Sequence, residues 1–365
     1  MSRPCKTVEF GRGIGPSAGL AALSTDTVPR AGPVGRRPPR VVAIGGGTGL
    51  SVLLRGLKAA LFPPEYPWLA ERDGECLKAI VTVADDGGSS GRLRRAYRLP
   101  APGDVRDCLL ALADDESTLA PIFDFRFKGT TDVGGHSLGN LILTALHQLE
   151  PSFCAAVERG GKMLGIRGRV LPSTDESVIL RAEFEDGSRL EGETRIASTG
   201  RLIRRLTLHP KLARALPEAR EAVGAADLIV IGPGSLYTSL IAPLLLKDLA
   251  DDIAQSRARV VLVMNLMTEP GETGGYTAAD HLVALRRHAP QVAIHDVLLN
   301  TAPIPEKAAA YYAARHSVPV PMDAELLRAL GCRTVEGDLF ENGVQIRHDP
   351  RKLAEAILGL VAEAR

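Results

Sequence analysis

The sequence is poor in cysteine and in aromatic residues, and it lacks both a strong net charge and a long apolar run. Its five cysteines are scattered, and none forms a Cys-x-x-Cys pair. A disulfide framework or a structural zinc site is therefore not expected. The same cysteine usage predicts a reducing compartment. Aromatic residues make up only 4% of the chain, which argues against a platform that stacks bases. The formal net charge of +1 gives no electrostatic sign of a nucleic-acid partner.

No apolar run approaches the length of a membrane span. Residues 1–39 are rich in Pro, Gly and Arg, and Gly15-Pro16 interrupts their only mildly apolar part. This composition predicts a disordered tail rather than a signal peptide. The whole chain is 45% hydrophobic and 24% charged over 365 residues, which is ordinary globular usage and ample for a buried core. We expect residues 40–365 to form a single domain.

Short apolar runs alternate with helical patterns along that domain. The runs lie at 41–44, 79–84, 227–231, 260–264 and 297–299, and helical spacing marks 278–288 and 350–364. Continuous apolar strands that alternate with helices predict an α/β fold, Rossmann-like and doubly wound around a mainly parallel sheet. Between about 163 and 208, charged and β-branched residues alternate around a hairpin signal at Asp186-Gly187. We assign that stretch to a small antiparallel β insertion.

A glycine-rich loop follows the first predicted strand, and leucines at helical spacing follow the loop. Glycines there let a phosphate approach the backbone, and the helix N-terminus adds N–H donors. The loop is not a Walker loop, because no Gly-Lys-Ser/Thr follows. It is not the dinucleotide fingerprint either, because Leu50 stands where a third glycine is needed. A tight turn without a ligand is the alternative to the phosphate contacts that we predict for Gly45, Gly46, Gly47, Thr48 and Gly49.

Two adjacent carboxylates end the second predicted strand. Asp85 and Asp86 precede a Gly-Gly-Ser-Ser stretch, and such a pair beside a phosphate site is typical of magnesium ligands or of acceptors for ribose hydroxyls. The sequence leaves these two roles open, and an Asx turn or N-cap would explain one aspartate. Asp104 is expected to cap a helix whose Arg106 faces either phosphate or solvent. Base or sugar contacts are predicted for Asp85, Asp86, Ser89, Ser90 and Asp104.

Residues 135–139 match the Gly-x-Ser-x-Gly pattern of a hydrolase nucleophile elbow. An elbow follows a buried strand, whereas residues 129–134 have loop composition, and only nominal Asp and His partners follow for a triad. A serine hydrolase is therefore disfavoured. We predict instead a loop that opens a helix at 138–149, with Ser137 as its cap and His136 or Asn140 near the ligand.

A second glycine turn, at 232–235, precedes a helix that starts at about Leu236. Two such loops at one sheet edge suit a diphosphate, with phosphate contacts predicted for Gly232, Gly234 and Ser235. The long loop after 260–264 carries polar side chains that either read a base or sugar or belong to an ordinary surface loop. The base or sugar contacts predicted in this region are Tyr237, Asn265, Thr268 and Tyr276.

Taken in order, these motifs resemble those of the CofD/YvcK superfamily, and specifically its YvcK-like branch of gluconeogenesis factors. The resemblance implies a Rossmann-like fold and a cytoplasmic bacterial factor associated with cell shape and peptidoglycan precursor supply on gluconeogenic carbon sources. The YvcK branch is associated with UDP-sugars, notably UDP-N-acetylglucosamine. The CofD branch transfers a phospholactyl-type group from a guanylyl donor to a deazaflavin with magnesium. The motifs that carry the resemblance lie at 42–49, 83–91, 102–106, 135–140, 231–239, 265–268, 272–273 and 276–281.

Two functional classes follow from this resemblance. The first is a regulatory UDP-sugar sensor that acts on a partner enzyme of amino-sugar synthesis. The second is a magnesium-dependent transferase in which Asp85 and Asp86 hold the metal on a diphosphate. The stretches at 232–239 and 265–268 are typical of the YvcK branch, and no general base or activated nucleophile stands out, so the sensor is favoured. We further expect a homo-oligomer, with no nucleic-acid partner.

Overall fold

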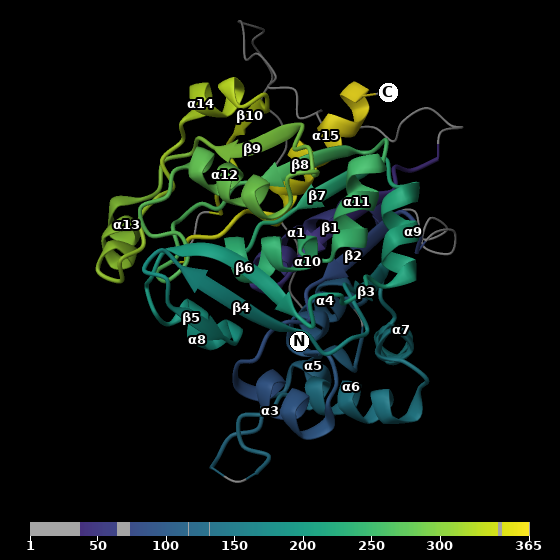
Figure 1. Cartoon of the computed structure of the whole chain (residues 1–365). Helices are drawn as coiled ribbons and strands as arrows, with labels where there is room; N and C mark the ends of the chain where they lie inside the picture. Colours follow the sequence, from purple (N-terminus) through teal and green to yellow (C-terminus); the bar gives the residue numbers. More distant parts are fainter. Residues whose placement is uncertain (1–36, 64–73, 116, 131, 342–344, 365) are drawn as a thin grey trace, which may run out of the picture. The chain divides into compact units, whose positions relative to one another are not determined.

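The computed structural model describes residues 37–63, 74–115, 117–130, 132–341 and 345–364. The predicted disordered tail thus lies almost wholly outside the described residues. From Pro38 onwards the chain forms one compact unit, which contains a seven-stranded and a three-stranded sheet (Figure 1). None of the helices in the described ranges is both long enough and apolar enough to span a membrane.

The seven-stranded sheet is parallel throughout, in the order β10-β9-β8-β7-β1-β2-β3. Every residue of β1, β2 and β7 is buried. This burial explains why β1 and β7 appear in the sequence as unbroken apolar runs, whereas Lys78 interrupts the apolar sequence of β2. The predicted fold class is confirmed. The strands are β1 (Val41–Gly45), β2 (Leu77–Val81), β3 (Arg169–Pro172), β7 (Leu228–Ile231), β8 (Arg259–Val263), β9 (Asp296–Asn300) and β10 (Arg333–Gly337).

Two strands that are distant in the sequence, β1 and β7, are neighbours at the centre of this sheet, where Val41 pairs with Leu228. From β1 the chain winds outwards through β2 to β3, and from β7 it winds in the opposite direction through β8 and β9 to β10. The connections after β1 and β7 therefore diverge at the carboxyl end of the strands. Open α/β sheets bind their ligands at such a switch point.

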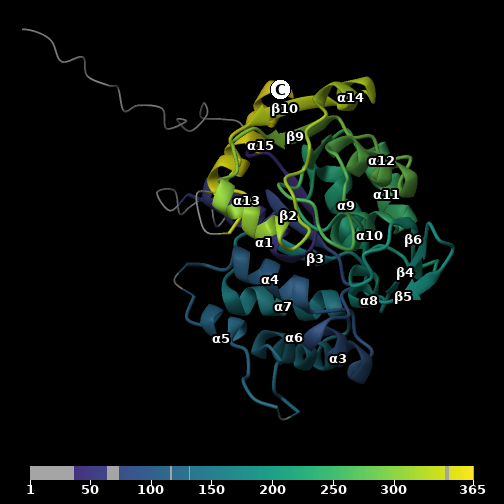
Figure 2. The ribbon, with the colours of Figure 1, turned by 90° about the vertical axis from the view of Figure 1, so that its left-hand side faces the viewer.

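Helices cover both faces of the sheet. Figures 1 and 2 show α1 and α15 on one side and α11 and α12 on the other, as right-handed crossovers in opposite directions require. Helices α1 and α15 pack so closely at Gly56 that a Cβ there would lie 1.9 Å from the carbonyl oxygen of Pro350. The helices are α1 (Gly47–Leu61), α3 (Gly88–Tyr97), α4 (Gly103–Leu112), α5 (Ala120–Asp124), α6 (Leu138–Leu149), α7 (Phe153–Leu164), α8 (Glu193–Ala197), α9 (Pro217–Ala225), the π-helix η1 (Leu236–Ile241), α10 (Ala242–Leu244), α11 (Lys247–Gln255), α12 (Ala278–His288), α13 (Glu306–Ala313), α14 (Ala324–Ala329) and α15 (Pro350–Ala364).

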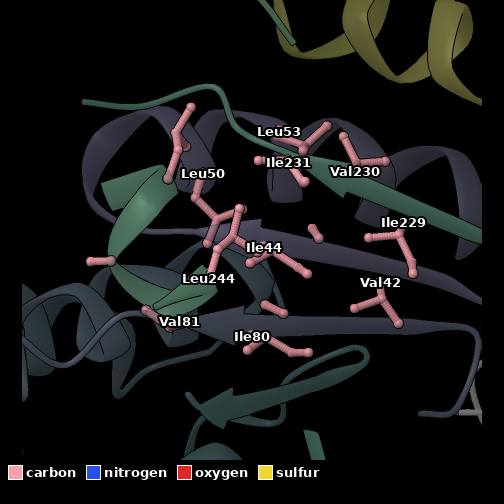
Figure 3. Close-up of a cluster of buried hydrophobic side chains, with 14 of the residues drawn as sticks. Val42, Ile44, Leu50, Leu53, Ile80, Val81, Ile229, Val230, Ile231 and Leu244 are labelled. Atoms are coloured by element: carbon pink, nitrogen blue, oxygen red, sulfur yellow. The ribbon is translucent and has the colours of Figure 1, made fainter. Parts of the chain in front are cut away.

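The core beneath the switch point joins the central strands to the helices on both faces. Ile44, Ile80 and Ile231 come from adjacent strands, while Leu50 comes from α1 and Leu244 from α10 (Figure 3). All five are almost completely buried. Such close packing resists displacement, so it holds the carboxyl ends of β1, β2 and β7 in fixed positions.

The antiparallel insertion is the three-stranded sheet β5-β4-β6. Its strands are β4 (Ile179–Phe184), β5 (Arg189–Glu191) and β6 (Ile203–His209), with α8 between β5 and β6. Burial alternates along β4, as expected for a sheet with one face on the core. The stretch at 163–208 that we assigned to the insertion also contains β3, which instead forms an edge of the parallel sheet.

Candidate functional site

A cavity of about 620 Å³ lies at the carboxyl ends of β1, β7 and β8, at the switch point of the sheet. Its volume is in the range of small-molecule and cofactor sites. The walls come from the loops that follow these three strands, and from two segments near the C-terminus, after α13 and before α15. The polar and charged lining residues are Thr48, Ser235, Ser239, Asn265, Thr268, Glu269, Tyr312, Arg315, Ser317, Arg347 and His348, with Gly46, Gly47, Gly49 and Gly234.

The first glycine loop needs its glycines for different reasons. A Cβ at Gly46 would lie 2.5 Å from both Thr82 Cγ2 and Asp104 Oδ2, and one at Gly49 would lie 2.4 Å from the Pro233 carbonyl oxygen. Packing alone therefore explains these two positions. Gly47 has a φ of +61°, and a Cβ there would meet only Ser239 Oγ, at 4.0 Å. Gly47 is thus the loop glycine with open space beside it, on the cavity wall.

The second glycine loop is tied by Asn265 to the loop that follows β8, and it lies against the first glycine loop. The Gly234 N–H donates to Asn265 Oδ1 at 3.2 Å, and Asn265 Nδ2 donates to the Gly234 carbonyl oxygen at 2.8 Å. A Cβ at Gly234 would lie 3.4 Å from the Gly46 carbonyl oxygen, so the two loops are in direct contact. Asn265 was predicted to read a base or sugar, and the structure gives its amide a further task in positioning the loop.

A carboxylate of the chain itself occupies the N-terminus of the helix after the second loop. Glu272 Oε2 accepts from the backbone N–H groups of Tyr237 and Thr238 at 2.8 and 3.4 Å, and Glu272 Oε1 accepts from Thr238 Oγ1 at 2.7 Å. Burial, followed by the charge of Glu269, raises the pKa of Glu272 to about 7. Pro233, Gly234, Ser235 and Ser239 of this region line the cavity, whereas Tyr237 and Thr238, which contact Glu272, do not.

Three other predicted contacts from this region have partners within the protein. Tyr237 is fully buried, and its hydroxyl contacts the Ile203 carbonyl oxygen at 3.2 Å and the Tyr276 hydroxyl at 2.9 Å. Neither tyrosine lines the cavity. Thr268 does line it, but its hydroxyl oxygen accepts from the Val318 N–H at 3.0 Å.

A second group of predicted residues gathers after β2, next to the first loop rather than in the cavity. Asp85 Oδ1 accepts from the Gly87 N–H at 2.7 Å, and Asp86 Oδ1 accepts from the Thr194 N–H at 2.9 Å. Glu193, at the start of α8, joins them from the insertion. Burial, then the charges of Asp85 and Asp86, raises the pKa of Glu193 to about 7. The group therefore concentrates negative charge.

Asp104 connects this carboxylate group to the first glycine loop. Its carboxylate accepts a hydrogen bond from the Gly47 N–H, while burial, followed by the charges of Asp85, Asp107 and Glu193, raises the pKa of Asp104 to about 8. Asp104 lies in the first turn of α4, where Pro102 holds the N-cap position and no side-chain cap bond forms. The expectation that Asp104 caps this helix is therefore wrong, because its carboxylate is directed to the neighbouring loop instead.

The remaining predicted residues form a buried polar network behind the carboxylates. Ser89 Oγ lies 2.9 Å from His136 Nδ1 and accepts from Asn140 Nδ2 at 3.2 Å. Arg106 donates to Asn140 Oδ1 at 3.3 Å, so Arg106 faces neither phosphate nor solvent. Ser90 hydrogen-bonds to the carboxylate of Asp85.

The Gly-x-Ser-x-Gly stretch is a loop that leads into α6. Ser137 is completely buried. Its backbone belongs to no strand and forms an isolated β-bridge with Arg126. It stands at the N-cap of α6 without a side-chain cap bond, because its hydroxyl donates to the Phe123 carbonyl oxygen at 3.3 Å. A nucleophile elbow needs an exposed serine after a strand, so the geometry here is not that of an elbow.

The structure thus divides the predicted residues between a cavity and a neighbouring carboxylate group. Within the described ranges, no set of three or more His, Cys, Asp or Glu side chains is placed to hold a metal ion. Five charged or titratable side chains of the cavity and one carboxylate of the group were not predicted from the sequence. Glu269 directly follows the predicted Thr268. No local motif marks the others, which are Tyr312, Arg315, Arg347 and His348 in the cavity and Glu193 in the group.

Two of these unpredicted residues give the cavity a positive wall. Arg315 and Arg347 both line it, and the guanidinium of Arg315 lies 3.7 Å from the centre of the Tyr311 ring, a cation–π arrangement that orients the charge. His348 is buried, hydrogen-bonds to the Met264 backbone, and has its pKa lowered to about 4 by burial. It therefore presents a neutral ring at neutral pH.

The chain is similar to known proteins over most of its length. The family model "2-phospho-L-lactate transferase CofD" matches residues 41–340. A "Gluconeogenesis factor" of Halalkalibacterium halodurans is 45% identical over 87% of this chain and 95% of that protein. The "Gluconeogenesis factor" of Bacillus subtilis is 43% identical over 89% and 99%. A crystal structure of a Bacillus halodurans protein matches with a TM-score of 0.82 and 44% identity, over 88% of this chain and 100% of that one. These matches confirm the resemblance that the ordered motifs predict.

Proposed function

Because the chain belongs to the CofD family, in its YvcK-like branch of gluconeogenesis factors, we propose that it is a cytoplasmic regulatory factor that binds a nucleotide sugar. The favoured ligand is UDP-N-acetylglucosamine. In this proposal the bound state is passed to a partner enzyme of amino-sugar synthesis, and so controls cell shape and peptidoglycan precursor supply during gluconeogenic growth.

The cavity at the switch point is the observation that carries this proposal. The N-terminus of α1, a 15-residue helix with no acidic residue in its first turn, lies at the cavity wall. Arg315 and Arg347 line the cavity from the two segments near the C-terminus. A helix N-terminus attracts anions, and guanidinium groups bind phosphate oxygens in pairs. This arrangement suits a diphosphate that lies between the Gly47 loop and the side chains of Arg315 and Arg347.

The rest of the lining suits hydroxyl-rich groups. Thr48, Ser235 and Ser239 bring hydroxyls to the wall, and Glu269 brings a carboxyl whose pKa is raised by burial. Such groups both donate to and accept from sugar hydroxyls. The cavity thus offers a charged part for phosphates and an uncharged polar part for a sugar or ribose.

The chemistry of the lining supports a sensor over an enzyme. The imidazole of His348 is neutral and hydrogen-bonded to backbone, and Ser137 lies buried outside the cavity. A pKa of about 4 makes His348 a weak base, and Ser137 cannot reach a ligand in the cavity.

The carboxylate group favours a second candidate, a magnesium-dependent transferase like those of the CofD branch. A Cβ at Gly103, the residue before Asp104, would lie 3.0 Å from Asp85 Oδ2. Burial raises the pKa of both aspartates, and the charge of Asp85 raises the pKa of Asp104 further, so a cation would relieve their repulsion. Magnesium on a diphosphate needs only one or two protein carboxylates, and Asp85 and Asp104 would supply them. When bound, the ion would neutralise charge on the phosphates.

Calorimetric titration tests the proposal and separates the two candidates. UDP-N-acetylglucosamine, UDP-glucose, GDP and NAD are compared, each with magnesium and with EDTA. We expect UDP-N-acetylglucosamine to bind most tightly in either condition, and Arg315→Ala and Arg347→Ala to weaken it. Arg351→Ala, an exposed position on α15, is the control. Preference for GDP, or binding that requires magnesium and is followed by transfer or hydrolysis, would favour the transferase. Sedimentation of the same samples tests the expected homo-oligomer.

A further inference from the structure

A second, larger groove lies on the insertion, away from the nucleotide cavity. Its volume is about 960 Å³, and it is lined by residues of β4, β5 and β6, by Arg195 on α8, by the end of α10 and start of α11, and by the end of α12. Figures 1 and 2 show this small sheet beside α10. The two cavities have no lining residue in common.

The groove is strongly basic. Seven arginine and lysine side chains line it, against the carboxylates of Glu183 and Glu191. Four of the seven pair with carboxylates, as in Arg181 with Glu191 at 2.7 Å. In the part of the chain that the structure describes, no carboxylate lies within ion-pair distance of the other three, which are all exposed: Arg195, Arg205 and Lys211.

The strand pattern explains why these charges share one face. Leu180, Ala182 and Phe184 alternate inwards along β4, so Arg181 and Glu183 face outwards. On β6, Arg205 is the register partner of Glu183 and therefore stands on the same outward face. The insertion thus uses its inner face for the core and its outer face for charge.

A histidine fixes the side of the groove formed by α12. His288 Nε2 accepts from the Leu206 N–H at 2.9 Å, and its Nδ1 contacts the Ala284 carbonyl oxygen at 2.7 Å. Both ring nitrogens are thereby engaged, and β6 is tied to α12. The groove is therefore a built feature with a stable wall rather than a gap between loose segments.

We propose that this groove is the docking surface for an acidic segment of a partner protein. Carboxylate side chains would pair with Arg195, Arg205 and Lys211. Leu212, which follows Lys211, is 87% exposed and offers an apolar contact at the rim, as protein interfaces commonly do. A nucleic-acid strand fits less well, because no Phe, Tyr or Trp lines the groove for stacking.

Strand β6 of the groove also contacts the helix that follows the second glycine loop of the nucleotide site. The Tyr237 hydroxyl contacts the carbonyl oxygen of Ile203 at the start of β6 and the hydroxyl of Tyr276 on the loop beyond the cavity. The inference rests on the proposed function in one respect, since it gives the partner of the sensor a place to bind. Its test uses no nucleotide sugar for the binding step, so the two proposals can fail separately.

Fluorescence anisotropy with a labelled peptide of alternating Glu and Leu tests the proposal on the full chain. A peptide of alternating Lys and Leu and a single-stranded oligothymidylate serve as comparison probes. The groove variant carries Arg195→Glu, Arg205→Glu and Lys211→Glu. The matched control carries Arg55→Glu, Arg95→Glu and Lys128→Glu, which are also exposed and lie outside the groove. A triple alanine variant of the groove repeats the test if charge reversal disturbs folding.

We expect the acidic peptide to bind the wild type and to lose at least about tenfold in affinity in the groove variant, equivalent to about 1.4 kcal/mol. The control variant should bind like the wild type. Equal losses in both variants, no binding of the acidic peptide, or tighter binding of the oligothymidylate would overturn the proposal. The thermal shift with UDP-N-acetylglucosamine is measured on each variant. If neither the wild type nor any variant shows this thermal shift while peptide binding is intact, only the proposed function is refuted.

Discussion

The carboxylate of Glu272 accepts a hydrogen bond from the backbone N–H of Tyr237 at 2.8 Å, at the N-terminus of η1. The second glycine loop therefore has an internal carboxyl group where a phosphate would otherwise meet the helix. At the first loop the Gly47 N–H also donates to a carboxyl group, that of the buried Asp104, although the first turn of α1 itself carries no acidic side chain. The phosphate contacts that we propose for the cavity thus depend on the remaining N–H groups at the start of α1 and on the two arginines that line the wall.

Replacing Glu272 should destabilise the protein. In Glu272→Ala the N–H groups of Tyr237 and Thr238 lose their acceptor inside the core, which costs about 1–3 kcal/mol for buried donors left unpaired. Urea unfolding at pH 6 gives the free energy of unfolding. Glu221→Ala, at an exposed position on α9, should change it little. A Glu272→Ala protein as stable as the control would mean that water replaces the carboxylate.

Gly47→Val should abolish ligand binding while leaving a folded protein. The substitution forces a β-branched residue to a φ of +61°, a strain on the order of 1–3 kcal/mol, and its side chain projects into open space that we assign to the phosphates. Ligand at about one hundred times its dissociation constant stabilises a protein by roughly 2.7 kcal/mol. The wild type should therefore melt a few degrees higher with UDP-N-acetylglucosamine, and the variant should not.

Gly187→Val is the matched control for this experiment. Gly187 also has a positive φ, of +78°, and a Cβ there meets nothing within 4 Å, but it lies in the hairpin turn of the insertion. Both variants should therefore lose similar stability, and only Gly47→Val should lose the ligand-induced shift. A normal shift in Gly47→Val would place the phosphates elsewhere.

The stability of the wild type should fall as pH rises through the titration of Asp104. Its pKa is raised from 3.8 to about 8 in the folded protein, so the folded state holds a proton that the unfolded chain has released. The contribution of this proton to the free energy of unfolding is fully present below pH 3.8 and is lost as pH rises towards 8. Asp104→Asn cannot titrate, so its melting temperature relative to the wild type should increase between pH 5 and pH 8.5. The same difference for Glu221→Gln should stay flat, and a flat difference for Asp104→Asn would show that this carboxyl ionises normally.

The double substitution Asp85→Asn and Asp86→Asn distinguishes the two roles left open for this pair. If the aspartates hold magnesium, ligand affinity should become insensitive to the metal once both charges are removed. If they accept sugar or ribose hydroxyls, affinity should fall equally with magnesium and with EDTA. Calorimetry in both conditions gives the answer. If EDTA does not change the affinity of the wild type and the double variant loses no affinity, neither residue belongs to the ligand site.

Local patterns were sufficient to predict the centre of the fold and the two glycine loops. The strands β1, β7 and β8 are almost wholly buried, so their apolar runs are unbroken, and the loops after them follow from strand direction. The edge strands β3 and β10 were not recognised as part of the parallel sheet. Strand β10 is partly exposed along its length and lacks an apolar run, and β3 has only four residues.

Side-chain direction limited the prediction of the site. Tyr237 is in a motif that lines the cavity at Ser235 and Ser239, yet its own ring is buried towards β6. Arg315 and Arg347 reach the cavity from distant segments, and nothing in their immediate sequence indicates it. A motif therefore located the loop, but packing between distant segments decided which of its side chains face the ligand.

The pairing of β1 with β7 has a consequence for how the protein is made. Arg40 and Asp227, 187 residues apart, are joined by a hydrogen bond where these strands begin. During synthesis, β1 emerges early and has only β2 as a partner until β7 leaves the ribosome. The edge of β1 stays open for most of translation, and contacts between such distant segments form slowly. The nascent chain is therefore most vulnerable to aggregation in its first two thirds, before any ligand cavity exists to stabilise it.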